Sequence, residues 1–196
     1  MNTNELMDIK NLYRLPYSKN DNPNGWIEIT TYCNMACKGC YKGIDRNDIE
    51  RKHEPLEKIK ADILELKRIR NCQIITISGG EALLHPDLLE ILAFVKSNGM
   101  CPVIHTNGIL INENNLVELK QHGLGGLIIR IDTLNRNASS EAELNSMRQH
   151  YADLIGKIRG LQLGFTCVIT KQNIQQIPEV INWFQSNHDK IGRAHV

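Results

Sequence analysis

The sequence predicts an α/β fold in which parallel strands alternate with helices. Five short apolar runs rich in β-branched residues lie along the chain and end in turn residues, which is typical of strands. Between these runs, apolar residues recur at the spacing of amphipathic helices. Because strands that alternate with helices pair in parallel, we expect an open sheet or a barrel, with any functional site at the carboxyl ends of the strands.

The predicted strands cover residues 26–30, 73–78, 102–106, 127–132 and 165–169. Apolar residues at helical spacing predict helices over about 56–66, 88–95, 141–159 and 174–184. The pairs Asn98-Gly99 and His122-Gly123 stand where helices are expected to end, because glycine readily adopts the left-handed conformation that follows a helix.

Composition and charge narrow the class of protein. The 196-residue chain has 41% hydrophobic and 23% charged residues, which are ordinary values for a globular domain. Its formal net charge of +1 gives no electrostatic reason to expect a nucleic acid or an anionic membrane as a partner. No run of about 18 apolar residues predicts a transmembrane helix. The polar start, with Glu5 and Asp8, does not resemble a secretion signal, so we expect a cytoplasmic protein.

The first chemical signal is the spacing CxxxCxxC at Cys33, Cys37 and Cys40. Three thiolates on one short loop after a strand suit a [4Fe–4S] cluster, which takes four thiolates when fully ligated. Three would leave one iron free to bind a small chelating molecule. A structural zinc site is the alternative, with His53 as the nearest histidine at an unusual spacing. The other three cysteines stand in or beside predicted strands and are interpreted as structural.

The second signal is Gly79-Gly80-Glu81 at the end of the second predicted strand. Two glycines permit close approach of the backbone to a ligand, and the carboxylate can accept hydrogen bonds from an ammonium group. An ordinary Gly-Gly turn is the alternative for this motif taken alone. His105, one residue before the turn that ends the third strand, is expected either to face the cavity or, as the favoured interpretation, to be a core histidine.

Together, the cysteine loop and the GGE motif resemble those of the radical SAM superfamily, and the resemblance covers about residues 26–190. It implies a partial (β/α) TIM-like barrel, with about five βα units of an expected six. It also implies an oxidoreductase that uses a [4Fe–4S] cluster and S-adenosylmethionine. Reductive cleavage of S-adenosylmethionine would yield a 5′-deoxyadenosyl radical that abstracts hydrogen from an unidentified peptide, protein or small-molecule substrate. The electron would come from a donor such as flavodoxin or ferredoxin.

The resemblance also implies roles for individual residues. Cys33, Cys37 and Cys40 would bind the cluster, and Tyr41 would lie near the adenine. The cofactor-binding residues would be completed by Gly79, Gly80, Glu81, Asn107, Arg130 and Asp132, with the GGE motif at the methionine amino group.

One residue departs from the family pattern. Many members with this pattern have serine where Arg130 stands. Arg130 is expected either to bind the methionine carboxylate or to pair with Glu28 within the sheet. Asp132 is expected either to contact the ligand or to cap the end of its strand.

The domain prediction has three parts: a polar lead-in over 1–25, an incomplete core domain over 26–190, and a non-native tail over 191–196. The tail, IGRAHV, matches one reading frame of a common sequencing-adapter oligonucleotide. Two readings of function within the family stay open: an enzyme that modifies a peptide or small metabolite, and an activase for a glycyl-radical enzyme. A zinc-stabilised α/β binding module without turnover is the alternative from another class.

Overall fold

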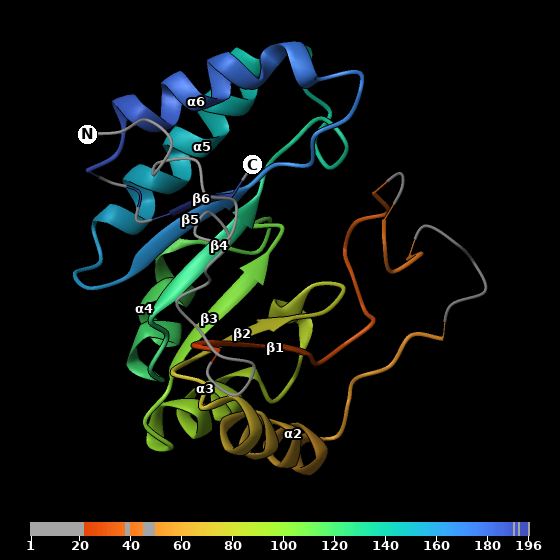
Figure 1. The fold of residues 1–196 in the computed structure, drawn as a ribbon, viewed down its shortest axis with the longest axis vertical. Helices are drawn as coiled ribbons and strands as arrows, with labels where there is room; N and C mark the ends of the chain where they lie inside the picture. Colours follow the sequence, from red (N-terminus) through yellow and green to blue (C-terminus); the bar gives the residue numbers. More distant parts are fainter. Residues whose placement is uncertain (1–21, 38–39, 45–49, 190, 192, 196) are drawn as a thin grey trace, which may run out of the picture.

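The computed structural model describes residues 22–37, 40–44, 50–189, 191 and 193–195. Its strands form one parallel sheet whose spatial order, β1-β2-β3-β4-β5-β6, is also their order along the chain (Figure 1). This one-way winding is the arrangement expected of successive βα units, so the predicted α/β class is confirmed. The strands are β1 (Asn24–Glu28), β2 (Ile74–Ser78), β3 (Cys101–Thr106), β4 (Gly126–Arg130), β5 (Gln162–Thr166) and β6 (Arg193–His195).

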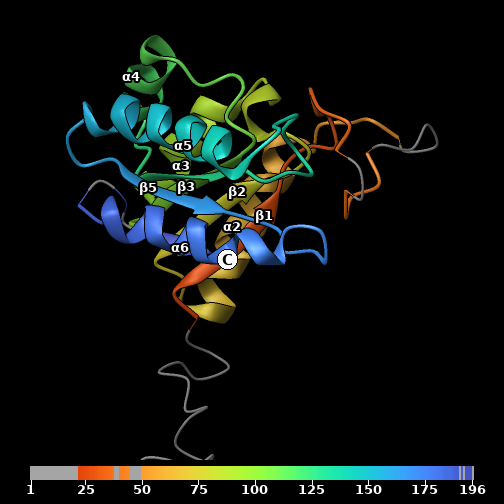
Figure 2. The ribbon, with the colours of Figure 1, turned by 90° about the horizontal axis from the view of Figure 1, so that it is seen from above.

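In the described part of the chain, five helices alternate with the strands. Figure 1 shows α2 at the β1 end of the sheet and α5 and α6 at the opposite end, and Figure 2 shows α3, α4 and α5 on the same side of the strands. Within the described residues, no helix has both the length and the apolar character that a membrane span requires. The helices are α2 (Leu56–Arg70), α3 (Leu88–Ser97), α4 (Glu113–Gln121), α5 (Glu141–Gly156) and α6 (Ile177–Ser186), with short 3₁₀ turns η1 (Ala82–Leu84) and η2 (Ile174–Gln176).

The two faces of the sheet differ in character. Alternate side chains of a strand point to opposite faces. Ile75 and Ile77 of β2 and Ile104 of β3 are fully buried in the core that the sheet forms with the helices. Thr76 of β2 and His105 of β3 point the other way and line a cavity. The helix-covered face therefore holds the core, and the opposite face is hollowed.

Some element bounds differ from those predicted. β1 begins at Asn24, inside the stretch 1–25 predicted as a lead-in, while residues 1–21 lie outside the described part. β5 starts at Gln162 rather than near 165, because its first residues pair with β4 although Gln162 and Gly164 are not typical strand residues. The spacing of apolar residues did not predict α4, for which the sequence indicated only the expected helix end at His122-Gly123.

The sixth strand lies in the segment 191–196 that was predicted to be a non-native tail. Residues 193–195 pair in parallel with β5. Such pairing uses backbone groups that every residue except proline carries, so the strand does not test the origin of the segment. The non-native tail stays a prediction, and the five predicted βα units are present.

The chain that leaves β1 is held against the GGE turn by backbone hydrogen bonds. The N–H of Gly80 donates to the carbonyl of Thr30 at 2.8 Å, and the N–H of Glu81 donates to the carbonyl of Tyr32 at 2.7 Å. A Cβ at position 80 would lie 2.3 Å from the Tyr32 carbonyl oxygen. A Cβ at Gly79, where φ is +154°, would lie 2.4 Å from the Thr30 oxygen. The glycines therefore serve the close approach of this chain's own backbone.

The same segment is paired on its other side by residues 50–54. The N–H of Thr31 donates to the carbonyl of Lys52 at 2.9 Å, and the N–H of Glu54 donates to the carbonyl of Ile29 at 2.9 Å. Residues 29–32 are thus enclosed between two backbone segments. The first cysteine of the CxxxCxxC motif, which follows directly, starts from a fixed position.

We expect Gly80→Ala to destabilise the protein by about 2 kcal/mol, since the added methyl group overlaps a backbone oxygen that cannot move freely. Thermal unfolding should show a Tm lower by about 5 °C. Gly156→Ala is the matched control, because a Cβ there meets nothing within 4 Å. A Tm for Gly80→Ala equal to that of the unchanged protein would contradict the close-approach argument.

Candidate cofactor site at the carboxyl edge of the sheet

One cavity at the carboxyl edge of the sheet collects most of the predicted site residues. The segment after β1 carries the three cysteines to this cavity, and the ends of β2, β3 and β4 complete its wall. Glu81 and Asp132 are fully buried and do not line it. Eight of the ten predicted residues do line it: Cys33, Cys37, Cys40, Tyr41, Gly79, Gly80, Asn107 and Arg130. Motifs that are far apart in the sequence therefore meet at one place.

The cysteine loop is attached to the end of β3 by an amide side chain. Asn107 donates from Nδ2 to the Cys33 sulfur at 4.0 Å and to Asn34 Oδ1 at 2.7 Å. Burial raises the pKa of the Cys33 and Cys37 thiols, and the nearby positive charge of Arg130 partly opposes this rise at Cys37. The cavity therefore presents partly desolvated thiols with a cation beside them.

Glu81 joins the GGE turn to the end of β3. Its carboxylate accepts hydrogen bonds from the Thr106 hydroxyl at 2.7 Å, the Asn107 N–H at 2.8 Å and the Leu83 N–H at 3.1 Å. Burial raises the pKa of Glu81, and these three hydrogen bonds oppose the rise. In the structure Glu81 positions the turn that carries Asn107. Its contact with a substrate ammonium group stays a prediction.

Arg130 lies at the end of β4 and pairs with Asp132. The guanidinium donates from Nε to Asp132 Oδ2 at 2.8 Å, and the same carboxylate accepts from the Leu134 N–H at 2.8 Å and the Val168 N–H at 3.1 Å. Arg130 does not pair with Glu28, and its contact with a methionine carboxylate stays a prediction. Of the two alternatives for Asp132, the strand-end cap is observed, and it also aims Arg130 into the cavity.

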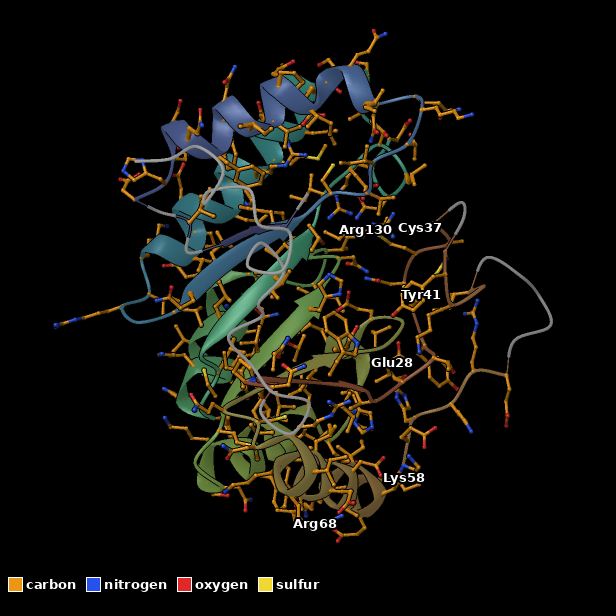
Figure 3. All side chains as sticks on the ribbon, viewed as in Figure 1. Glu28, Cys37, Tyr41, Lys58, Arg68 and Arg130 are labelled. Carbon is orange, nitrogen blue, oxygen red and sulfur yellow. The ribbon has the colours of Figure 1, made fainter. Side chains whose placement is uncertain are left out.

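Glu28, at the end of β1, binds two residues that follow the third cysteine. The Tyr41 hydroxyl donates to Glu28 Oε1 at 2.8 Å, and the Lys42 ammonium pairs with the other carboxylate oxygen. Figure 3 shows Tyr41 beside the cysteine loop, with Glu28 below it and Arg130 close to Cys37. Partial burial of the hydroxyl, together with the hydrogen bond to Glu28, raises the pKa of Tyr41 to about 12. Glu28 therefore ties the end of the loop to the sheet.

The zinc alternative finds no support in the described residues. His53 does not line the cysteine cavity; its ring stacks on Tyr32 at 4.5 Å between centroids and meets His85 edge-on at 5.0 Å. No three His, Cys, Asp or Glu side chains of the described part converge on one point as a single metal ion requires. A [4Fe–4S] cluster has no such requirement, because each thiolate binds a different iron. Three thiols of one loop around an open cavity fit the cluster.

Three contributors to the site went unassigned in the sequence. Arg136 donates to the carbonyl of Asn107 and contacts the sulfur of Met35 at 3.5 Å. Glu28 holds the loop as described above. His105, for which the sequence favoured a core position over a place facing the cavity, lines the cavity. Polar residues at the ends of parallel strands were the signal that could have found Glu28 and His105.

Comparison with known sequences agrees with this site. The sequence model of the Radical SAM superfamily matches residues 27–184. The chain therefore belongs to the radical SAM superfamily, whose members are enzymes that use a [4Fe–4S] cluster and S-adenosylmethionine.

Individual relatives cover most of this chain but only part of their own length. The chain is 31% identical over 185 residues to Fe-coproporphyrin III synthase of Methanosarcina barkeri, an alignment that covers 91% of this chain and 44% of the relative. It is 32% identical over 158 residues to a probable GTP 3′,8-cyclase of Methanocaldococcus jannaschii, an alignment that covers 80% of this chain and 50% of the relative. The chain thus spans about half the length of the curated relatives it matches.

A solved structure supports the fold. SuiB of Streptococcus suis, in a crystal structure with bound S-adenosylmethionine, superposes with a TM-score of 0.63 at 20% identity, over 89% of this chain and 40% of SuiB. Radical SAM proteins of this kind are TIM-like barrels, which agrees with the partial barrel predicted from the sequence.

Replacing Glu28 by glutamine should lower the pKa of Tyr41 from about 12 toward the ordinary value of 10.0. The carboxylate stabilises the neutral phenol by accepting its hydrogen bond and repels the phenolate, while the burial contribution remains. NMR titration of ¹³C-labelled tyrosine, with Tyr41→Phe to assign the resonance, measures the change. Glu57→Gln, on the exposed side of α2, is the control, and an unchanged Tyr41 titration would refute the contact.

The raised thiol pKa values of Cys33 and Cys37 predict slow alkylation of the metal-free chain at neutral pH. Only the thiolate reacts, so the rate with iodoacetamide should keep rising to above pH 9.0, the ordinary value for these thiols. Arg130→Ser should move the Cys37 profile further up in pH, since it removes a stabilising cation. Peptide mass spectrometry gives the rates, and a plateau below pH 9.0 would contradict the burial argument.

Proposed function

We propose that this chain carries the domain of a radical SAM enzyme that binds a [4Fe–4S] cluster and cleaves S-adenosylmethionine reductively. The observation that carries the proposal is the single cavity shared by Cys33, Cys37 and Cys40 with the ends of β2, β3 and β4. Together, the bound cluster and S-adenosylmethionine supply a 5′-deoxyadenosyl radical, which abstracts hydrogen from a substrate.

The residues of the cavity have separable roles in this proposal. Cys33, Cys37 and Cys40 hold the cluster through their thiolates, which requires the loss of their protons on assembly. Arg130, held by Asp132, offers N–H groups that suit a carboxylate such as that of methionine. These assignments rest on the lining of the cavity and on the chemistry of the side chains.

The rest of the rim orients these groups. The backbone of Gly79 and Gly80 and the amide of Asn107 line the same cavity. Thr30 and Tyr32 hold the glycine turn through their carbonyls, and Glu81 accepts a hydrogen bond from the N–H of Asn107. Tyr41, beside the loop, is the residue proposed to lie near the adenine. A fixed rim of this kind favours a defined placement of cofactor and substrate.

The substrate is proposed only as a class. Relatives named for coproporphyrin and GTP chemistry favour a small-molecule substrate, whereas one solved structure of SuiB holds a precursor peptide. An electron donor such as flavodoxin or ferredoxin and a cytoplasmic, reducing setting complete the proposal, because thiolate-bound clusters need reduced cysteines.

Anaerobic reconstitution tests the proposal. The chain should take up about four irons per molecule and release 5′-deoxyadenosine when given dithionite and S-adenosylmethionine. Cys37→Ser should lower the release at least 100-fold and reduce the iron content, since one thiolate ligand is lost. Cys72→Ala, in the core away from the cavity, is the matched control. A colourless protein with one bound zinc, or a Cys37→Ser variant with unchanged iron and unchanged release, would overturn it.

A further inference from the structure

The concave face of the sheet holds a second, larger cavity that the cofactor proposal does not use. Its volume is about 470 Å³, within the range of small-molecule sites. Alternate side chains of each strand point away from the helix-covered core, and these side chains form the wall of the cavity. Trp26 of β1, Thr76 of β2, Val103 of β3, Ile128 of β4 and Thr166 of β5 are among the lining residues.

The wall of this cavity is uncharged. None of its fourteen lining residues, all in the described part of the chain, is Asp, Glu, Lys or Arg. Hydroxyl groups of Thr76 and Thr166 and the imidazole of His105 supply hydrogen-bonding atoms among apolar side chains. A charged group that entered would lose its hydration without gaining a counter-charge, which is strongly unfavourable. The wall therefore selects an uncharged group.

Aromatic rings mark one side of the cavity. Trp26 remains 45% exposed although it stands within β1, and its indole lies 5.3 Å from the His105 ring, at an interplanar angle of 57°. Large exposed aromatic surface inside a cavity is suited to contact with another flat ring. Nε2 of His105 lies 3.2 Å from the Thr166 hydroxyl, which fixes the imidazole across the strands.

The two cavities adjoin at one residue. His105 lines both the cysteine cavity and the larger one. A group bound in the larger cavity against His105 therefore lies next to the site proposed for the cofactor.

We infer that the larger cavity receives an uncharged, flat ring of the substrate, and that hydrogen is taken from a saturated carbon next to this ring. Trp26 provides its stacking surface, while His105 and Thr166 orient its polar edge. Charged groups of the same substrate stay outside the cavity. This inference rests on the proposed function for the identity of the occupant, but its binding chemistry is testable alone.

Indole and indole-3-acetate are matched probes, since they share a ring and differ by one carboxylate. Titration calorimetry on the full chain should show binding of indole, with indole-3-acetate at least ten-fold weaker. Val103→Trp, which fills the cavity, should weaken indole binding at least ten-fold. Val117→Trp, on the exposed side of α4, is the control and should leave it unchanged.

Trp26→Ala provides a second variant that removes volume instead of adding it, so the test does not depend on how Val103→Trp folds. It should also weaken indole binding at least ten-fold. Equal affinity for the two probes, no indole binding by the unchanged protein, or unchanged binding in Trp26→Ala would overturn the inference. Iron and sulfide content of the unchanged protein, measured in parallel, tests the proposed function separately.

Discussion

The site depends on the contact between the GGE turn and the chain that leaves β1. Two glycines let the backbones of residues 79–81 and 30–32 approach so closely that a single methyl group would collide with a carbonyl oxygen. The register of β1 on β2, with Glu28 opposite Ser78, brings these segments to the same level. Every later feature of the cysteine loop starts from this contact, because it fixes the point at which the loop leaves the sheet.

Two buried carboxylates likewise fix the strand ends around the cavity. Glu81 connects the ends of β2 and β3, and Asp132 connects the end of β4 to Val168, just beyond β5. Burying a carboxylate is unfavourable unless donors replace water, and both groups accept several hydrogen bonds from N–H or O–H groups. The strand ends are therefore held by hydrogen bonds to carboxylates behind the cavity, in addition to the contact between Asn107 and Cys33 within it.

Local patterns were enough to predict the parallel α/β fold and the place where the motifs meet. Apolar runs and helical periodicity are properties of neighbouring residues, and strand ends of a parallel sheet converge whatever their sequence. The hydrogen-bond and ion-pair partners of individual side chains were harder to predict, because folding brings these partners together from distant parts of the sequence. Arg130 was equally compatible with Glu28 or a ligand, and only the fold shows that Asp132 takes it while Glu28 holds Tyr41.

The errors in element bounds have a related cause. Gln162 and Gly164 belong to β5 because β4 lies beside them, not because they favour extended structure. The glycines of the GGE motif were expected to permit close approach of the backbone to a ligand. In the structure they permit close approach to the chain's own backbone, and the contact with a ligand stays a prediction. Sequence alone indicates that space is needed at such a position and does not say what occupies it.

The position of His105 has a consequence for substitutions. Residues of the strand interior and residues of the rim line separate cavities, so under the proposed assignment a substitution in the larger cavity changes substrate recognition without touching the cofactor site. His105 is the exception, because it faces both cavities. A substitution of His105 changes the lining of both cavities at once, so among the described residues it is the one lining position whose replacement affects the two sites together.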